Sequence, residues 1–502
     1  MAATRPNVLV FMADQMSPLF LPFYGHPVVQ APHMQALADE GVVFDGAYCN
    51  VPLCAPARYA FMSGRLPSRI GGFDNAAEFP ADVPTFAHAL RLSGYRTILS
   101  GKMHFCGADQ LHGFEERLTT DIYPADFGWA PDWDAPSERQ EWFHNMSSVL
   151  EAGPCVRTNQ LDFDDEVVHA AERKLYEMVR GRDRRPFLMT VSMSHPHDPF
   201  AIPARYWDLY DDEAIDLPGF VLPPDEADPH SMRVRTMCEM DLTRPTKAQV
   251  RAARRAYYGA ISYVDEQLGR LRRALEATGL ADDTVIVLLS DHGEMLGERG
   301  LWYKMTFFES SARIPLVVHA PGRFGAGRAK EAVSSMDLLP TFLDLAGAPS
   351  IPTPIEGRSL LPHLEGRGGH DGVIAEYMAE GAVAPIVMLR RGRHKFVHSP
   401  ADPDQLYDLE ADPLERTNLA TDPAHAGRVE AFRAEAATVW DLPRLHEEVL
   451  ASQRRRRFVH AALKEGTASA WDYQPFVDAR NQYVRSHMPL DDVEAMARFP
   501  RP

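Results

Sequence analysis

The chain is organised around residues 51–65, which read VPLCAPARYAFMSGR. Cys54 is followed by Pro56 and Arg58, and then by small and aromatic residues that can begin a helix. Proline suits the first turn of a helix, because its missing N–H is no loss there. We therefore expect Cys54 at the positive end of a helix dipole, with free backbone donors nearby and Arg58 folded back toward it. Such a position can hold an anionic substrate.

The surroundings of Cys54 argue against the commoner fate of a lone cysteine, which is to be a small buried hydrophobe. The pattern Cys54-x-Pro-x-Arg, with Ser-Gly-Arg at 63–65, resembles the signature of the type I sulfatases. The resemblance implies that Cys54 is oxidised after translation to formylglycine, whose hydrated aldehyde is the nucleophile. It also implies a formylglycine-generating enzyme as a partner during maturation.

Length, charge and cysteine content limit the class of protein. A chain of 502 residues can form two domains, or one large domain with an appendage. Its 52 basic and 70 acidic side chains leave a net charge of -18, which argues against a nucleic-acid partner. Five cysteines without a disulfide-rich pattern indicate a reducing compartment. We read no signal peptide and no bilayer-spanning run, so we expect a cytoplasmic protein without a membrane partner.

Four apolar strands are each predicted to end in polar residues. Residues 8–12 lead into Asp14 and Gln15, 95–100 into Lys102 and His104, 187–193 into His195 and His197, and 284–289 into Asp291 and His292. In doubly wound α/β sheets the ligand lies beyond the carboxyl ends of the strands, so four strands can deliver these residues to one crevice. This convergence indicates an enzyme. Before the fourth strand, a capping box at Thr246 and Gln249 begins a long predicted helix that reaches Gly279.

The fold class is α/β, and the chain divides into three predicted parts. The resemblance implies an alkaline phosphatase-like sandwich, in which helices flank a large, mixed, mostly parallel sheet. We expect residues 1–370 to form the catalytic domain and 371–450 a smaller C-terminal α+β subdomain with a short antiparallel sheet. Residues 451–502 are predicted to form an extended oligomerisation tail in a homodimer or homotetramer. Asp491 or Asp492 of this tail is expected to complete the neighbour's pocket.

A metal site is implied by the resemblance. Its ligands would be Asp14, Gln15, the modified Cys54, Asp291 and His292. Their oxygen and nitrogen atoms suit a divalent cation, and the family usually holds calcium. Many relatives have Asp at the position of Gln15 and Asn at that of His292, so Mn²⁺ and Mg²⁺ stay open as alternatives.

The catalytic roles follow from the same resemblance. Lys102 and Lys304 match the two lysines that hold sulfate oxygens, and Arg58 should steady the diol. His104 would take the proton from the remaining hydroxyl and so expel sulfate. His197 is the expected general acid for the leaving alcohol. A lysine or histidine on a loop is usually only a solvated side chain, but the order and strand-end positions of these residues favour the catalytic interpretation.

An aromatic segment is the clue to the alcohol part of the substrate. Residues 121–133 and 141–145 hold three tryptophans within fourteen residues, amid acidic side chains. Aromatic faces attract quaternary ammonium groups through cation-π contacts. A hydrophobic lid or a subunit contact is the alternative on composition alone.

The same segment resembles the choline-sulfatase branch of the family, as do residues 290–304 and 375–381. The branch implies hydrolysis of choline O-sulfate to choline and sulfate. We expect Asn75 to contact the sulfate or its ester oxygen. The candidates for the trimethylammonium end are Trp129, His144 and Glu380, with Glu376 in reserve.

Two other functions are weighed against this one. A phosphonate monoester or phosphodiester hydrolase of the same superfamily can share the nucleophile and the metal ligands. The pair Lys102 and His104 favours sulfate, because that branch tends to lack it. A non-catalytic choline sulfate binding protein predicts an unmodified thiol at Cys54 and saturable binding without sulfate release.

Overall fold

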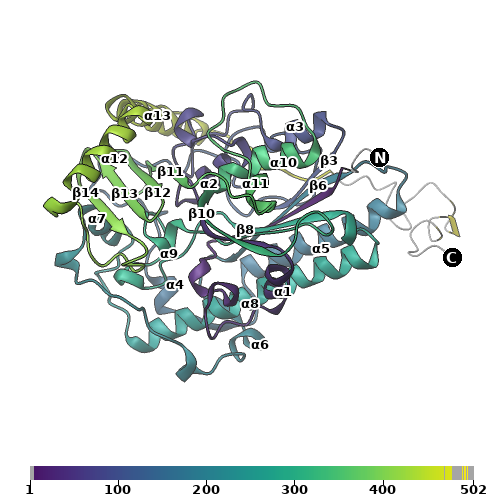
Figure 1. The fold of residues 1–502 in the computed structure, drawn as a ribbon, viewed down its shortest axis with the longest axis horizontal. Coiled ribbons are helices and arrows are strands. Elements are labelled where there is room, and N and C mark those ends of the chain that lie inside the picture. Colours follow the sequence, from purple (N-terminus) through teal and green to yellow (C-terminus); the bar gives the residue numbers. More distant parts are fainter. Residues whose placement is uncertain (1–4, 469, 477–488, 490, 493–494, 496–502) are drawn as a thin grey trace.

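An eight-stranded sheet forms the centre of the protein, in a computed structural model that describes residues 5–468, 470–476, 489, 491–492 and 495 (Figure 1). The strand order is β10-β2-β9-β8-β1-β6-β3-β4. The strands are β1 (Asn7–Asp14), β2 (Val42–Tyr48), β3 (Arg96–Gly101), β4 (Glu116–Arg117), β6 (Phe187–Pro196), β8 (Thr284–Ser290), β9 (Leu316–His319) and β10 (Gly327–Ser334).

The four strands that were expected to carry polar residues are neighbours in this sheet. Strand β1 pairs in parallel with both β8 and β6, and β6 pairs in parallel with β3. Leu9 of β1, for example, lies between Met189 and Ile286. These strands are covered on both faces, which explains their uninterrupted apolar sequences. Strand β9 runs antiparallel to its neighbours, so the sheet is mixed and mostly parallel, which confirms the predicted fold class.

Helices cover both faces of the large sheet (Figure 1). Those on one side include α1, α5 and α8, and those on the other include α2, α3 and α10. The helices are α1 (Pro32–Glu40), α2 (Cys54–Ser63), α3 (Phe86–Leu92), α4 (Ser147–Leu150), α5 (Asn159–Arg180), α6 (Ala204–Trp207), α7 (Pro229–Met237), α8 (Lys247–Ala277), α9 (Glu309–Ala312), α10 (Leu338–Ala346), α11 (Leu361–Leu364), α12 (Ala426–Val439) and α13 (Leu442–Leu463). The capping box at Thr246 and Gln249 begins α8 as predicted.

A four-stranded antiparallel sheet follows the large one in the chain. Its strands are β11 (Gly372–Tyr377), β12 (Ile386–Arg391), β13 (His394–Ser399) and β14 (Asp402–Asp408), in that spatial order. Helix α12 packs on it, and the ring of Phe432 stacks on that of Phe396 at 5.3 Å. The short antiparallel sheet is therefore confirmed. A separate small ribbon pairs β5 (Gly153–Cys155) with β7 (Ala201–Pro203).

Helix α13 was not predicted from the sequence. It spans the position near 450 where the tail was expected to begin, and the arginine run at 454–457 lies within it. Further along, the ring of Trp471 contacts Phe127 at 5.1 Å, and Tyr473 lies under the guanidinium of Arg117. The described part of the tail thus packs on its own chain, while Asp491 and Asp492 are exposed. The domain division and the oligomer stay predictions.

Among the described residues, no helix combines the length and the apolar character that a membrane crossing requires.

Candidate active site

Cys54 is the first residue of helix α2, as its sequence context predicted. Leu53 precedes it in extended conformation as the N-cap residue, and Pro56 lies in the first turn. Its thiol is buried, with Sγ 3.2 Å from Nε2 of His292. The backbone N–H of Ala55, the residue after Cys54, donates a hydrogen bond of 3.0 Å to Asn75 Oδ1. This bond satisfies one of the free backbone donors at the start of the helix.

The encoded thiol of Cys54 is a weak nucleophile in this environment. Burial, followed by the charge of Asp14, raises its pKa to about 11. A thiol with such a pKa is protonated at neutral pH, whereas the thiolate is the reactive form. The site is therefore poorly suited to cysteine chemistry, which agrees with a residue that serves as a precursor.

Four side chains around Cys54 form a compact group of metal-binding atoms. One ligand atom from each of Asp14, Cys54, Asp291 and His292 lies within 4.8 Å of the others, and all four residues are buried. They come from the carboxyl ends of β1 and β8 and from the start of α2. Two carboxylates and an imidazole are donors that suit a divalent cation, so the residues present fit the ion implied for this position.

Arg58 and Lys102 neutralise the two carboxylates. Arg58 Nη2 lies 2.8 Å from Asp14 Oδ2, and its Nε lies 2.9 Å from Asp291 Oδ2. The ammonium of Lys102 also pairs with Asp14. Burial alone would raise the pKa of Asp14, but Lys102, His197 and Arg58 together hold it well below its usual value. Both lysine and arginine are themselves buried, so Asp14 is ionised within a low-dielectric site.

Gln15 is held by several hydrogen bonds beside this group. Its backbone N–H donates to Asp291 Oδ1 at 3.0 Å, its side-chain oxygen accepts from Lys304 Nζ at 2.6 Å, and its side-chain nitrogen donates to Glu294. The carbonyl oxygen that was predicted to contact the metal thus already has a cationic partner. Its role as a ligand stays a prediction.

His104 faces the same site with both ring nitrogens unsatisfied. Among the described residues, neither nitrogen has a hydrogen-bond partner, although the side chain is buried. Burial, followed by the charge of Lys102, lowers its pKa to about 3, so the ring is neutral and can accept a proton. A buried polar group without a partner is rare in proteins and often marks a catalytic role. The backbone here has a φ of 55°, a conformation uncommon outside glycine.

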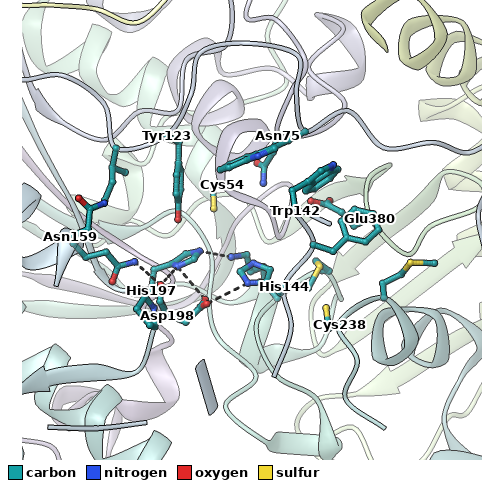
Figure 2. A pocket seen from close by; sticks show the side chains of 18 of the residues that line it. Cys54, Asn75, Tyr123, Trp142, His144, Asn159, His197, Asp198, Cys238 and Glu380 are labelled. Carbon is teal, nitrogen blue, oxygen red and sulfur yellow. Dashed lines mark hydrogen bonds and ion pairs between the residues drawn. The ribbon is translucent and has the colours of Figure 1, made fainter. Parts of the chain in front are cut away.

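His197 lies between two acceptors and a cation, which determines its tautomer. Its Nδ1 donates to the backbone oxygen of Asp198 at 2.7 Å, while Nε2 accepts from Lys304 Nζ at 2.7 Å. Burial and then Lys304 hold its pKa well below the usual value. The Asp198 carboxylate lies 3.2 Å from His197 Nδ1 and 3.4 Å from His144 Nδ1, so it joins the two imidazoles (Figure 2).

His195, which lies in the same turn as His197, has a structural role. Nδ1 of His195 lies 2.7 Å from Asp164, and its ring packs against Tyr263. It is not among the residues that line the cavity described next.

A cavity of about 340 Å³ opens beside Cys54 (Figure 2). Seven of the predicted site residues line it: Cys54, Asn75, Trp129, His144, His197, Lys304 and Glu380. Asp14, Asp291 and His292 form the buried group with Cys54, and Gln15, Arg58 and Lys102 contact it. His104 contacts the ring of Trp129, which lines the cavity, at 5.5 Å. Tyr123, Trp142 and Asp198 also line the cavity, although none was predicted as a site residue. Tyr123 and Trp142 lie within the aromatic segments 121–133 and 141–145, and Asp198 directly follows His197.

Aromatic rings line part of the cavity. The rings of Trp129 and Trp142 are nearly parallel, with centroids 6.3 Å apart and an interplanar angle of 18°. The third tryptophan does not take part: the indole of Trp133 is buried and donates to the backbone oxygen of Ala379 at 3.4 Å. Of the three tryptophans noted in the sequence, Trp129 and Trp142 therefore line the cavity, and Trp133 does not.

Two acidic candidates behave differently. Glu380 lines the cavity, and burial raises its pKa to about 7. Glu376 accepts hydrogen bonds from Ser68 and from the indole of Trp440, and it is not among the lining residues. The reserve candidate therefore has a structural role, and Glu380 is the acid that a ligand in the cavity can reach.

Comparisons with known proteins find relatives that match most of the chain. A family model described as sulfatase matches residues 6–348, and one described as choline sulfatase enzyme C terminal matches 447–499. A choline-sulfatase of Rhizobium meliloti (strain 1021) is 47% identical over 511 residues, covering 100% of both chains. An arylsulfatase of Clostridium perfringens is 28% identical over 86% of this chain and 93% of its own. The crystal structure of a phosphonate monoester hydrolase of Agrobacterium radiobacter aligns with a TM-score of 0.72, at 25% identity, over 86% of this chain and 95% of that one.

Proposed function

The chain belongs to the sulfatase family, and from this premise we propose that it hydrolyses choline O-sulfate to choline and inorganic sulfate. The observation that carries the proposal is a single cavity lined by two unlike sets of side chains. Cys54 and Lys304 line it, as do Trp129, Trp142 and Glu380, and Figure 2 shows Trp142 and Glu380 on the same side of Cys54. A zwitterion with a sulfate at one end and a quaternary ammonium at the other matches this division of charge.

The reactive group is proposed to be formylglycine formed from Cys54 by a formylglycine-generating enzyme. As its hydrated diol, this residue supplies the nucleophilic oxygen. A bound divalent cation, for which we propose Ca²⁺, supplies positive charge that acidifies a diol hydroxyl. Asp14, Asp291 and His292 would hold the ion together with the modified residue, with Gln15 as a further candidate. Arg58 keeps both carboxylates in place through its ion pairs.

The sulfate end is proposed to use the remaining polar residues. Lys102 and Lys304 would neutralise sulfate oxygens, and burial makes each charge more effective than it is in water. His104 would accept the proton whose removal expels sulfate, because its ring is neutral and its nitrogens are free of hydrogen bonds to the described residues. His197 Nε2 would deliver the proton to the leaving alcohol. Lys304 Nζ, at 2.7 Å, would orient the ring of His197 while it keeps its own charge for sulfate.

The ammonium end is proposed to combine aromatic and acidic groups. Cation-π contacts with Trp129 and Trp142 would each contribute about 0.5–2 kcal/mol, depending on how far the site excludes water. The carboxylate of Glu380 adds a negative charge that attracts an ammonium group in the cavity at short distance. His144 lies next to this end, with its Nδ1 directed at Asp198.

Glu380 gives the enzyme a distinctive pH dependence. Its pKa of about 7 means that the carboxyl is neutral below pH 7 and anionic above it. Neither charge of choline sulfate titrates in this range, so we expect KM for choline sulfate to fall roughly tenfold between pH 6 and 8, as Glu380 gains a charge worth at least ~1.4 kcal/mol at close range. Steady-state kinetics across this range check the prediction.

The control for this pH dependence is a sulfate ester whose aryl part carries no charge. KM for 4-nitrophenyl sulfate should stay constant between pH 6 and 8, and Glu380→Gln should remove the step seen with choline sulfate. A step of equal size with both substrates would assign it to the sulfate end.

The proposed function itself is tested by product analysis. The purified protein should release choline and sulfate from choline O-sulfate in equal amounts, and faster than it cleaves a phenyl phosphonate monoester. Preference for the phosphonate would favour the phosphonate monoester hydrolase alternative. Saturable binding without sulfate release, with an intact thiol at Cys54, would favour the binding protein.

We also propose a cytoplasmic location and a homodimer or homotetramer. The location is supported by the five cysteines, all of which are free. The oligomer is supported by exposed aromatic side chains near the C-terminus, of which Phe458 and Phe476 are 76% and 88% exposed.

A further inference from the structure

The arginine run at 454–457 has no role in the chemistry proposed above. It lies near the end of helix α13, far along the chain from the cavity residues. Three of its four side chains form ion pairs with aspartates: Arg454 with Asp134, Arg456 with Asp74, and Arg457 with Asp132. All three aspartates belong to the two loops that supply Asn75 and Trp129 to the cavity. The run therefore connects the helix to two walls of the active site.

The pair between Arg456 and Asp74 differs from the others because it is buried. Arg456 Nη1 and Nη2 each donate to one oxygen of Asp74 at 2.6 Å, and the two side chains are 7% and 0% exposed. By contrast, Arg454 and Arg457 are 61% and 47% exposed. A bidentate pair fixes both distance and orientation, and burial protects it from screening by salt.

Asp74 is connected to the start of helix α2 through the residue that follows it. The next residue, Asn75, lines the cavity, and its Oδ1 accepts the hydrogen bond of 3.0 Å from the backbone of Ala55. Figure 2 shows Asn75 above Cys54, on the way to Trp142 and Glu380. A displacement of Asp74 would therefore move a cavity side chain relative to residue 54 itself.

Helix α13 also contacts the segment that supports the aromatic wall. The side-chain oxygen of Gln453 accepts a hydrogen bond of 2.9 Å from the backbone N–H of Trp133. The indole of Trp133 packs against His446 and donates to Ala379, the residue before Glu380. The buried Trp133 thus joins α13 to both sides of the proposed ammonium end.

From these contacts we propose that Arg456 is a positioning residue of the active site. By holding Asp74 it fixes Asn75 beside residue 54 and anchors α13, which in turn orders the loop that carries Trp129. The inference rests on the proposed function, because it assigns α13 to the recognition of the two ends of choline sulfate. Lysine cannot replace this arginine fully, since its ammonium lacks the two parallel donors.

The test replaces Arg456 with methionine, which keeps most of the apolar stem but removes the guanidinium. We expect kcat/KM for choline sulfate to fall about 100-fold, as misplaced groups in a preorganised site typically cause. For 4-nitrophenyl sulfate, we expect kcat/KM to fall by only about tenfold, because this substrate has no ammonium group to be misplaced. With both substrates, kcat/KM of Arg456→Lys should lie between that of the wild type and that of Arg456→Met.

The matched control is Arg455→Met. Arg455 belongs to the same run, is exposed, and forms no ion pair with any described residue. Its replacement should leave both kcat/KM values unchanged. Circular dichroism and the melting temperature of each variant establish that the folded enzyme is compared.

A double variant separates positioning from stability. Arg456→Met alone leaves Asp74 buried and unpaired, which destabilises a protein, whereas apolar replacement of both partners is often neutral. Adding Asp74→Leu should therefore restore the melting temperature but not the activity on choline sulfate. Recovery of wild-type kinetics in the double variant would overturn the proposal. Equal losses of kcat on both substrates, with unchanged KM, would also overturn the proposal, because they indicate only that less of the enzyme is folded.

Failure of the proposed function gives a different result. In that case the wild-type protein cleaves 4-nitrophenyl sulfate but not choline sulfate. The role of Arg456 is then decided with the aryl ester alone, for which the tenfold loss is expected and an unchanged kcat/KM overturns the inference.

Discussion

Cys54→Ala should reduce turnover of choline sulfate by roughly 10⁵-fold or more, the scale on which removal of a nucleophile acts. Alanine cannot be converted to formylglycine, so the diol oxygen is lost while Lys102, Lys304 and the cavity stay in place. The fold should persist, because alanine is a strong helix former and fits the space of a buried cysteine at the start of α2.

Three measurements make this result specific. Mass spectrometry of the peptide over residue 54 should detect an aldehyde in the wild-type protein and none in the variant. Cys155→Ala is the matched control, because this free cysteine lies in β5 and does not line the cavity; its activity should equal that of the wild type. Residual activity near the wild-type level in Cys54→Ala would remove formylglycine from the mechanism.

His197→Asn should lower kcat for choline sulfate by about 10³-fold, within the range of general acid catalysis. Choline is a poor leaving group, so its oxygen must gain a proton as the bond to sulfur breaks. 4-Nitrophenolate leaves without a proton. For its sulfate ester we therefore expect kcat of the variant to fall by at most about tenfold. Parallel kinetics with the two esters measure this difference.

His195→Asn is the control for the leaving-group effect. His195 lies two residues away in the same turn, but it is bound to Asp164 and does not line the cavity. Compared at equal folded fractions, its kinetics on both esters should match those of the wild type. Equal losses on the two esters in His197→Asn would contradict the general acid role and favour a role for this histidine in holding Lys304.

The buried polar group around Cys54 was largely predictable because most of its residues follow strands. An apolar run of five to seven residues identifies a buried strand, and parallel strands place their carboxyl ends at one edge. Asp14, Lys102, His197 and Asp291 could thus be brought together before any coordinates were known. Cys54 was found through its local pattern, because a helix start depends on neighbouring residues.

The ammonium end was less predictable because composition does not give orientation. The three tryptophans have similar sequence surroundings, yet Trp129 and Trp142 line the cavity while Trp133 points to Ala379. The same holds for the two glutamates: Glu376 is bound by Ser68 and Trp440, and Glu380 is free to meet a ligand. Which member of each set reaches the cavity depends on partners far away in the chain.

Local order in the sequence therefore determined the strands, the start of α2 and the polar residues at the strand ends, because backbone geometry and burial act over a few neighbouring residues. Tertiary structure alone decided that Arg456 of α13 meets Asp74 across 382 positions of the chain. The physical reason is that ion pairs and hydrogen bonds between distant segments form only where the fold brings both partners together and excludes water from them.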